Sequence, residues 1–212
     1  MEPDEIAQNI FDRVVDWCEN HSGDTPLECM EYHNPSDLSV FADSYLTDEE
    51  DEEIENSDEN FWESVKKEYE KLWKEGMSSY IGSYLSDELK MLAESIIQDA
   101  ELCDACKARR LKAYDEALHK FADAIKQALQ NGKPLGEGEL YDWFKKIGDV
   151  AFGVKNNAYY EEVDYYESPY DMLDDNEKLE VLSSLLDAIA DVRYDIEEQY
   201  LPELEALTNN NS

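Results

Sequence analysis

Cys103 and Cys106 have the spacing that comes nearest to a metal or redox site in this sequence. Two cysteines at positions i and i+3 of a helix point the same way and can share a metal ion or form a redox pair. A closed zinc site needs four ligands, however, and ten residues separate Cys18 from Cys29, with no second CxxC pair. Cys103 also continues an apolar helical pattern. We therefore expect Cys103 and Cys106 to be buried thiols, without a metal ion and without a redox role.

The other residues that could perform catalysis are isolated. His21, His33 and His119 lie far apart in the sequence, and no serine or cysteine stands in a nucleophile motif such as GxSxG. Gly132-Lys133 lacks both the upstream glycine and the following Ser or Thr of a phosphate-binding loop, so it is predicted to end a helix. A catalytic carboxylate pair needs an apolar cleft that shifts its pKa values, and 53 acidic residues single out no pair. The sequence predicts a protein that is not an enzyme and binds no cofactor.

Residues 48–59 are the densest acidic segment, with nine acids in twelve residues and Ile54 as the only apolar residue. The segment lacks the central glycine and the alternating ligands of an EF-hand loop, so we expect only weak, non-specific binding of divalent cations. Mutual repulsion predicts an exposed loop or a frayed helix start, unless a partner neutralises it. The candidate partner-binding residues here are Asp48, Glu49, Glu50, Asp51, Glu52, Glu53, Glu55, Asp58 and Glu59.

A second acidic segment, residues 156–175, contains five tyrosines among seven acids. One interpretation is that the tyrosine rings cover the core. The other is an interface, in which tyrosines provide contact area at low entropic cost and the acids complement Arg and Lys on a partner. The candidate partner-binding residues here are Tyr159, Tyr160, Glu161, Glu162, Asp164, Tyr165, Tyr166, Glu167 and Asp171.

Apolar residues recur at helical spacing along most of the chain, and no alternating β pattern competes with them. Thr25-Pro26-Leu27-Glu28 is a capping box that should start a short helix. Gly76 and Pro202 are predicted to end helices. The helices are expected at about 4–20, 26–34, 37–46, 58–75, 86–130 (one bent helix or two), 138–154 and 176–200. The fold class is therefore all-α, a compact bundle-like domain of about six to eight helices with acidic loops.

The net charge of −35, from 18 basic and 53 acidic residues, is unevenly distributed. Residues 1–65 contain 21 acids and one arginine, residues 66–155 contain 16 acids and 15 basic residues, and residues 156–212 contain 16 acids and two basic residues. We interpret these ranges as an acidic N-terminal helical limb, a near-neutral helical scaffold, and an acidic Tyr-rich segment with a C-terminal helix, all folded together as one domain. If the acidic residues served solubility alone, there would be no reason for residues 66–155 to be nearly neutral.

This charge repels nucleic acid and anionic membranes, so direct binding to either is not expected. With 42% hydrophobic residues the chain has enough apolar surface to fold. We find neither a signal-peptide pattern nor an apolar run of the roughly 20 residues that span a bilayer. These features predict a cytoplasmic protein.

Helices hold acidic side chains about 5 to 6 Å apart at i, i+3 and i+4, a spacing comparable to that of neighbouring phosphates. In composition and helical character the chain resembles the acidic DNA-mimic inhibitors with which phages block restriction or CRISPR nucleases. The resemblance implies a phage protein that acts in the host cytoplasm, occupies the basic groove of a nuclease or other defence protein, and competes with its nucleic acid. An acidic chaperone, immunity protein or assembly factor that sequesters a basic client is the alternative. A helical enzyme with a carboxylate-bound metal ion is the third hypothesis.

Overall fold

The computed structural model describes residues 1–153 and 167–210, and within these ranges it contains helices and no β-strand. Eight α-helices in the described ranges have seven or more residues, which confirms the predicted all-α fold. None of the described helices combines the length and the apolar character needed to cross a membrane. Internal contacts divide the chain into unit 1, Met1–Tyr80, and unit 2, Ile81–Ser212. This boundary lies within one helix, α5 (Glu59–Gln98), and coincides with neither of the two divisions expected from the charge.

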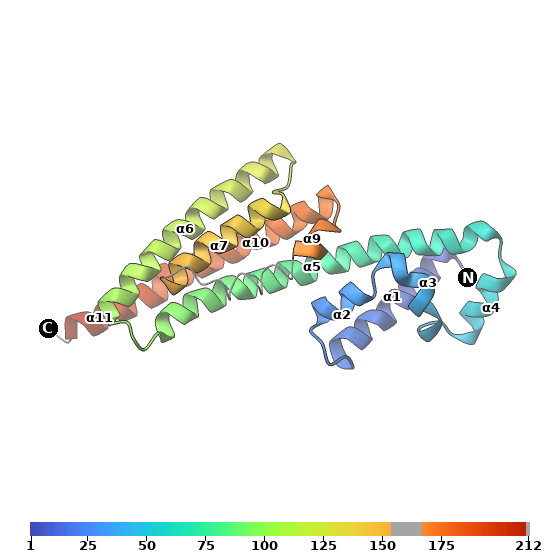
Figure 1. Cartoon of the computed structure of the whole chain (residues 1–212), viewed down its shortest axis with the longest axis horizontal. Coiled ribbons are helices and arrows are strands. Elements are labelled where there is room, and N and C mark those ends of the chain that lie inside the picture. Colours follow the sequence, from blue (N-terminus) through green and yellow to red (C-terminus); the bar gives the residue numbers. More distant parts are fainter. Residues whose placement is uncertain (154–166, 211–212) are drawn as a thin grey trace. The chain divides into compact units, whose positions relative to one another are not determined.

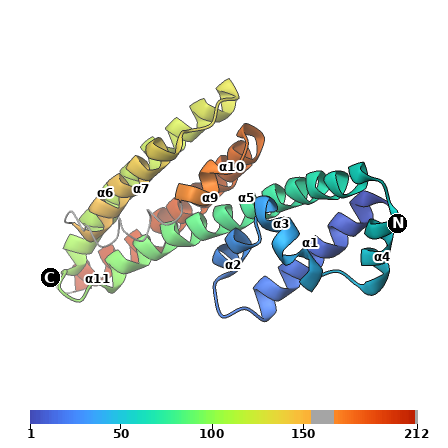
Figure 2. The same cartoon turned by 45° about the vertical axis from the view of Figure 1, so that its right-hand side comes forward.

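Unit 1 packs short helices along the first part of α5 (Figures 1 and 2). Its elements before α5 are α1 (Pro3–Asn20), α2 (Pro26–Tyr32), a 3₁₀ turn (Pro35–Asp37), α3 (Leu38–Phe41), a second 3₁₀ turn (Ala42–Ser44) and α4 (Asp48–Asn56). The predicted capping box at the start of α2 is present, with the Thr25 hydroxyl accepting from the Glu28 N–H at 3.3 Å.

The core of unit 1 lies between α5 and the helices beside it. Tyr69 and Trp73 of α5 are at most 1% exposed. The Trp73 ring N–H donates to the Met30 carbonyl at 2.8 Å, and the Tyr69 hydroxyl donates to the carbonyl of His33 at 2.9 Å. Both rings thus fill the core while their polar atoms are satisfied, as buried Trp and Tyr require.

The prediction that Gly76 ends the helix is wrong, because α5 continues past it to Gln98. A side chain at residue 76 would place its Cβ atom 2.8 Å from the Phe11 ring of α1. The glycine therefore provides room for a ring between two helices. Glycine in a helix costs about 1 kcal/mol relative to alanine, and the close packing of Phe11 offsets that cost.

A disulfide bond between Cys18 and Cys29 joins the end of α1 to α2. Both residues are buried, at 2% and 3% exposure. This bond was not predicted from the sequence. Disulfides are rare in the reducing cytosol, so this bond is a feature that the predicted cytoplasmic location does not explain.

Unit 2 is built around α6, which contacts α7, α10 and α11. Figures 1 and 2 both show α6, α7 and α10 side by side. The second part of α5 contacts both α6 and α10. The hydroxyl of Tyr114 in α6 donates to the Leu89 carbonyl of α5 at 2.6 Å, and Gly82 of α5 lies against Ser184 of α10. After α5, the elements of unit 2 are α6 (Asp104–Asn131), α7 (Glu137–Phe152), α9 (Glu167–Asp171), α10 (Asp175–Asp195), a π-helical turn (Ile196–Tyr200) and α11 (Leu201–Asn210).

The predicted helical stretch 86–130 consists of two helices, because α5 ends at Gln98 and α6 begins at Asp104. Cys103 is the N-cap residue of α6, with φ −69° and ψ 156°, and it is exposed. The expectation of two buried thiols is therefore wrong. The apolar pattern that seemed to include Cys103 stops with α5, and the buried face of α6 starts only at Ala108.

Pro202 does not end the last helix, contrary to the prediction, since the chain stays helical through the π turn and α11 to Asn210. In a regular α-helix the proline ring clashes with the carbonyl four residues earlier, here that of Glu198. Glu198 lies inside the π turn, where one extra residue per turn changes the backbone spacing. We attribute the continuation of the helix to this turn.

Candidate functional site

The acidic segment predicted as a loop or a frayed helix start folds as the helix α4, with seven acids among its nine residues. Thr47 caps its N-terminus: the hydroxyl accepts from the Glu50 N–H at 3.3 Å, and the Glu50 carboxylate accepts from the Thr47 N–H at 2.7 Å. Four acids occupy the first turn, where the positive end of the helix dipole stabilises negative charge. Local interactions thus favour a helix despite the repulsion among its side chains.

Glu50 attaches α4 to α1. Its side chain is only 2% exposed, and the Arg13 guanidinium donates to both carboxylate oxygens, at 2.6 and 3.0 Å. Asn9 donates to the same carboxylate at 2.8 Å. Burial alone would raise the pKa of Glu50, but the hydrogen bonds from Arg13, Thr47 and Asn9 outweigh it and lower the pKa to about 2. Glu50 was predicted to bind a partner, and the structure instead places it inside unit 1 as a support for the helix.

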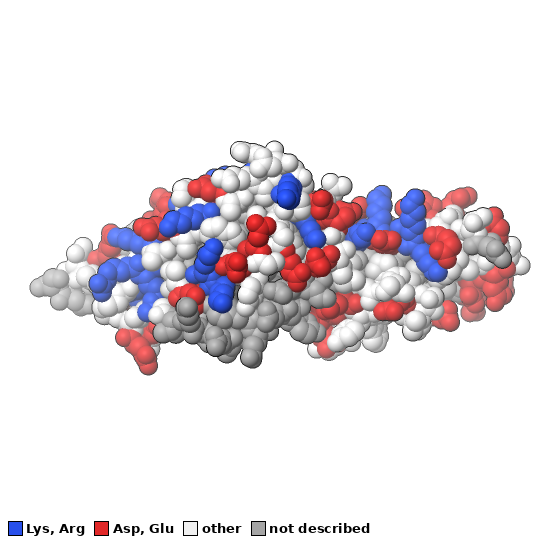
Figure 3. All heavy atoms as spheres, turned by 45° about the horizontal axis from the view of Figure 1, so that its top comes forward, with Lys and Arg blue, Asp and Glu red and all other residues white. Residues whose placement is uncertain are grey.

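The other predicted acids of this segment lie on the surface. Glu53 is partly exposed, and its carboxylate is 3.3 Å from the amino-terminal nitrogen of Met1. Glu59 begins α5, and its side chain lies outside the described part of the chain. The exposed members of the set are Asp48, Glu49, Asp51, Glu52 and Glu55 on α4, and Asp58 just beyond it. We call the five residues on α4 the α4 acidic face. In Figure 3, carboxylates gather over the α4 end of unit 1, and the lysines of unit 1 lie along α5 with carboxylates between them.

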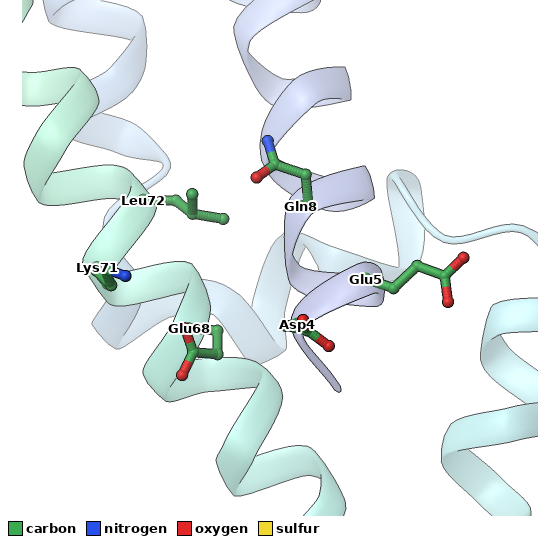
Figure 4. A pocket seen from close by; sticks show the side chains of 6 residues that line it. All are labelled: Asp4, Glu5, Gln8, Glu68, Lys71 and Leu72. Atoms are coloured by element: carbon green, nitrogen blue, oxygen red, sulfur yellow. The ribbon is translucent and has the colours of Figure 1, made fainter. Parts of the chain in front are cut away.

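An open hollow of about 380 Å³ lies between the first turns of α1 and residues 68–72 of α5, also within unit 1. Figure 4 shows Gln8 and Leu72 extending toward each other across it, whereas the Glu5 carboxylate points away. Asp4 and Glu68 contribute carboxylates on the two sides, and Lys71 is the one cation among the lining residues. A hollow of this composition can accept the end of a cationic side chain. Sequence reasoning missed it, because α1 and α5 are brought together only by the tertiary fold.

The second predicted acidic segment falls mostly outside the described residues. This applies to Tyr159, Tyr160, Glu161, Glu162, Asp164, Tyr165 and Tyr166. Glu167 is the first residue of α9, and Asp171 is exposed at its end, 3.6 Å from the Lys178 ammonium. The neighbouring Tyr170 is 1% exposed and donates to the Leu135 carbonyl at 3.0 Å. For this one tyrosine of the segment, the interpretation as a core residue is confirmed.

Cys18, Cys29 and His33 form the one group of three potential metal ligands found within residues 1–153 and 167–210, with all ligand atoms within 4.8 Å of one another. The two sulfurs are joined in the disulfide, which leaves no thiolate for a metal ion. His33 Nδ1 donates to the Cys29 carbonyl at 2.8 Å, and the Tyr45 hydroxyl pairs with Nε2 at 2.9 Å. Both ring nitrogens of His33 are therefore engaged, and the group contributes to the packing of unit 1. No carboxylate cluster with metal-ligand geometry occurs in the described ranges, so the third hypothesis, an enzyme with a carboxylate-bound metal, gains no support.

Comparisons with known proteins give no relative: no family model, no curated protein and no solved structure matches this chain. The function is therefore inferred from the geometry of the chain itself.

Proposed function

We propose that this protein binds the basic, nucleic-acid-binding surface of a partner protein and blocks it competitively. The α4 acidic face takes the place of phosphates, and the acids of residues 161–171 are a second candidate set for contact with the partner. The partner is a nuclease or another nucleic-acid-binding defence protein, the class to which the resemblance to acidic DNA mimics points.

The observation that carries the proposal is the linear density of carboxylates on α4. Nine residues at about 1.5 Å each give a helix of roughly 13 Å. It bears six carboxylates that are at least partly exposed, since only Glu50 of its seven acids is buried. This is about one charge per 2 Å, close to the one per ~1.7 Å of axis in duplex DNA. A surface built to bind DNA phosphates would thus meet a similar charge density on α4.

The attachment of α4 to α1 supports the same proposal. An acidic segment that was flexible in the free protein would lose conformational entropy on binding, which weakens association. Here the Arg13–Glu50 pair and the Thr47 cap hold the helix in place before any partner arrives. The carboxylates are therefore preorganised, as the phosphates of a duplex are.

The test begins with capture of partners from a host lysate at low and at high salt, and its decisive step is competition. Labelled DNA or RNA bound to the purified partner should be displaced by this protein, and the displacement should weaken as salt rises. Simultaneous binding of nucleic acid and this protein to the partner would refute the competitive mechanism. If the partner then gained stability without losing activity, the alternative of an acidic protein that protects a basic client would replace it.

Charge-neutralising variants locate the interface. Glu52→Gln alone should have little effect, because single exposed charges contribute modestly. A fivefold set should weaken binding more than tenfold at low salt, since it removes most of the phosphate-like charge. It consists of Asp48→Asn, Glu49→Gln, Asp51→Asn, Glu52→Gln and Glu55→Gln, and a second set neutralises Glu161, Glu162, Asp164 and Glu167.

The matched control removes the same number of exposed carboxylates from residues 66–155. It consists of Glu75→Gln, Asp87→Asn, Glu101→Gln, Glu116→Gln and Asp142→Asn, all exposed. The net charge of the control and of the fivefold α4 variant is identical, so a difference between them reports position rather than total charge. Equal loss of binding in both would refute the assignment of the interface to α4.

A further inference from the structure

Cys103 and Cys106 lie at the start of α6, a helix of 28 residues in unit 2. Cys103 is exposed and Cys106 is partly exposed. The Cys103 sulfur accepts a hydrogen bond from the Cys106 N–H at 3.3 Å, in the position where a serine or aspartate would cap the helix. Both thiols are therefore accessible from solvent.

The two sulfurs are 2.6 Å apart. A disulfide bond is about 2.05 Å long, so little movement of either side chain is needed to form one. The extended backbone of Cys103, outside the first helical turn, brings its side chain back over the turn to Cys106. The pair is thus arranged for reversible formation of an intramolecular disulfide.

The surroundings favour a thiolate at Cys106. The Cys103 thiol donates to the Cys106 sulfur, and the Arg109 guanidinium donates to it at 3.3 Å. These two hydrogen bonds lower the pKa of Cys106 below its ordinary value. The sulfur also lies in the first turn of a helix, where the dipole stabilises negative charge.

A metal site at this position has too few ligands in the described part of the chain. Within residues 1–153 and 167–210, the one group of three potential ligands in mutual reach is Cys18, Cys29 and His33, which includes neither Cys103 nor Cys106. A structural zinc ion requires four ligands and a catalytic one requires three. The chemistry available to two accessible, adjacent thiols is thiol–disulfide exchange.

We propose that Cys103 and Cys106 form a redox-active dithiol that reduces a disulfide of a small molecule or of a protein. This activity is independent of the proposed inhibition of a nucleic-acid-binding partner. The Cys106 thiolate attacks one sulfur of the substrate disulfide, the S–S bond breaks, and the departing thiolate takes a proton from water. The Cys103 thiol then gives up its proton and attacks the Cys106 sulfur, releasing the second substrate thiolate, which is protonated in turn. Two electrons pass to the substrate, and Cys103 and Cys106 are left joined by a disulfide.

The buried Cys18–Cys29 bond is an internal reference for this reaction. Cys18 and Cys29 are only 2% and 3% exposed, so an attacking thiolate does not reach their sulfurs in the folded chain. Exchange at neutral pH should therefore be confined to the pair on α6.

The experiment uses the full chain with Cys103 and Cys106 reduced. It is equilibrated with defined ratios of reduced and oxidised glutathione in one arm, and mixed with insulin as a protein disulfide in the other. Free thiols are then alkylated, and peptide mass spectrometry assigns each cysteine. We expect Cys103 and Cys106 to be oxidised reversibly and together, at one ratio of reduced to oxidised glutathione. Reaction with glutathione, with insulin or with both shows whether the substrate is a small disulfide, a protein disulfide or either.

Variants test the order of the steps. Cys103→Ser should accumulate a mixed disulfide at Cys106, because the resolving thiol is missing. Arg109→Gln should slow alkylation of Cys106 at neutral pH about fivefold or more, since the thiolate loses a charged donor. Lys107→Gln removes a neighbouring charge that is not one of the hydrogen-bond donors to the Cys106 sulfur, and it should have a much smaller effect. The proposal is overturned if neither disulfide is reduced, if Cys103→Ser traps no adduct, or if the purified chain holds zinc that the Cys103→Ser variant loses.

Discussion

Replacing Glu50 by glutamine tests whether α4 is held to α1 by a buried carboxylate. The folded pKa of Glu50 is about 2, against 4.5 for an unperturbed glutamate. The difference corresponds to about 3 kcal/mol of folding free energy at neutral pH. Because the folded pKa is the lower one, this contribution is present in full above about pH 4.5 and is lost as the pH falls toward 2.

Glu50→Gln keeps an acceptor oxygen that the Thr47 capping box can use, but it removes the negative charge that faces Arg13. We expect the variant to be less stable than the wild type by about 2 to 3 kcal/mol at pH 7. At pH 2 the difference should fall below about 1 kcal/mol, because the wild-type carboxyl is then largely protonated in the unfolded chain and half protonated in the folded one. Urea unfolding followed by circular dichroism at both pH values measures this.

Glu49→Gln is the matched control, since it makes the same change of charge on the neighbouring, exposed residue. It should alter stability by no more than about 0.5 kcal/mol at either pH. The reasoning would be refuted if Glu50→Gln cost no more than Glu49→Gln at pH 7, or if its cost did not shrink on acidification.

Three other perturbations test the fold. Added salt between low and physiological ionic strength should raise the melting temperature, because it screens repulsion in a chain of net charge −35, and a salt-independent melting temperature would contradict this. Cys18→Ser opens a disulfide loop with a sequence separation of 11 and should lower the free energy of unfolding by about 3 kcal/mol. Urea unfolding under non-reducing conditions measures this, and an unchanged midpoint would show that the bond does not stabilise unit 1. Gly76→Ala should destabilise the protein by about 1 to 3 kcal/mol, because the added Cβ meets the Phe11 ring. Gly138→Ala in α7 places its Cβ in open space and should be neutral or stabilising. The opposite order of melting temperatures would refute the packing argument.

The helices themselves were predictable from the sequence, because their apolar residues recur at helical spacing and pack on one face. The helix expected at 4–20 is α1, whose buried face contains Ile6, Ile10 and Val14, and the helix expected at 138–154 is α7. The errors concern where helices end. Gly76 and Pro202 are ordinary stop signals, but the Phe11 ring and the π turn give each of them another role. Those causes lie in packing and in backbone geometry, which a local pattern does not contain.

The candidate site could be predicted as a region but not in its internal organisation. Seven acids of α4 look alike in the sequence, and what distinguishes Glu50 is an arginine 37 residues earlier. Two signals were present: Thr47 and Glu50 have the capping-box spacing, and Arg13 is the one basic residue in the first 65. Similarly, Cys103 seemed to belong to an apolar stripe because the sequence did not show where α5 ends and α6 begins.

The carboxylates of α4 have two different roles: one fixes the position of the helix, and the others give it exposed negative charge. One carboxylate is neutralised internally by Arg13 and positions the helix, and the others remain available to solvent. The attachment of α4 to α1 and the exposed charge of α4 can therefore be removed by separate substitutions. Glu50→Gln weakens the attachment of α4 while leaving every exposed carboxylate in place, whereas the fivefold α4 variant keeps the attachment and removes the charge. If preorganised carboxylates replace phosphates, both variants should bind a basic partner less well. Only the fivefold variant should also show a reduced salt dependence of binding, because only it changes the number of charges at the interface.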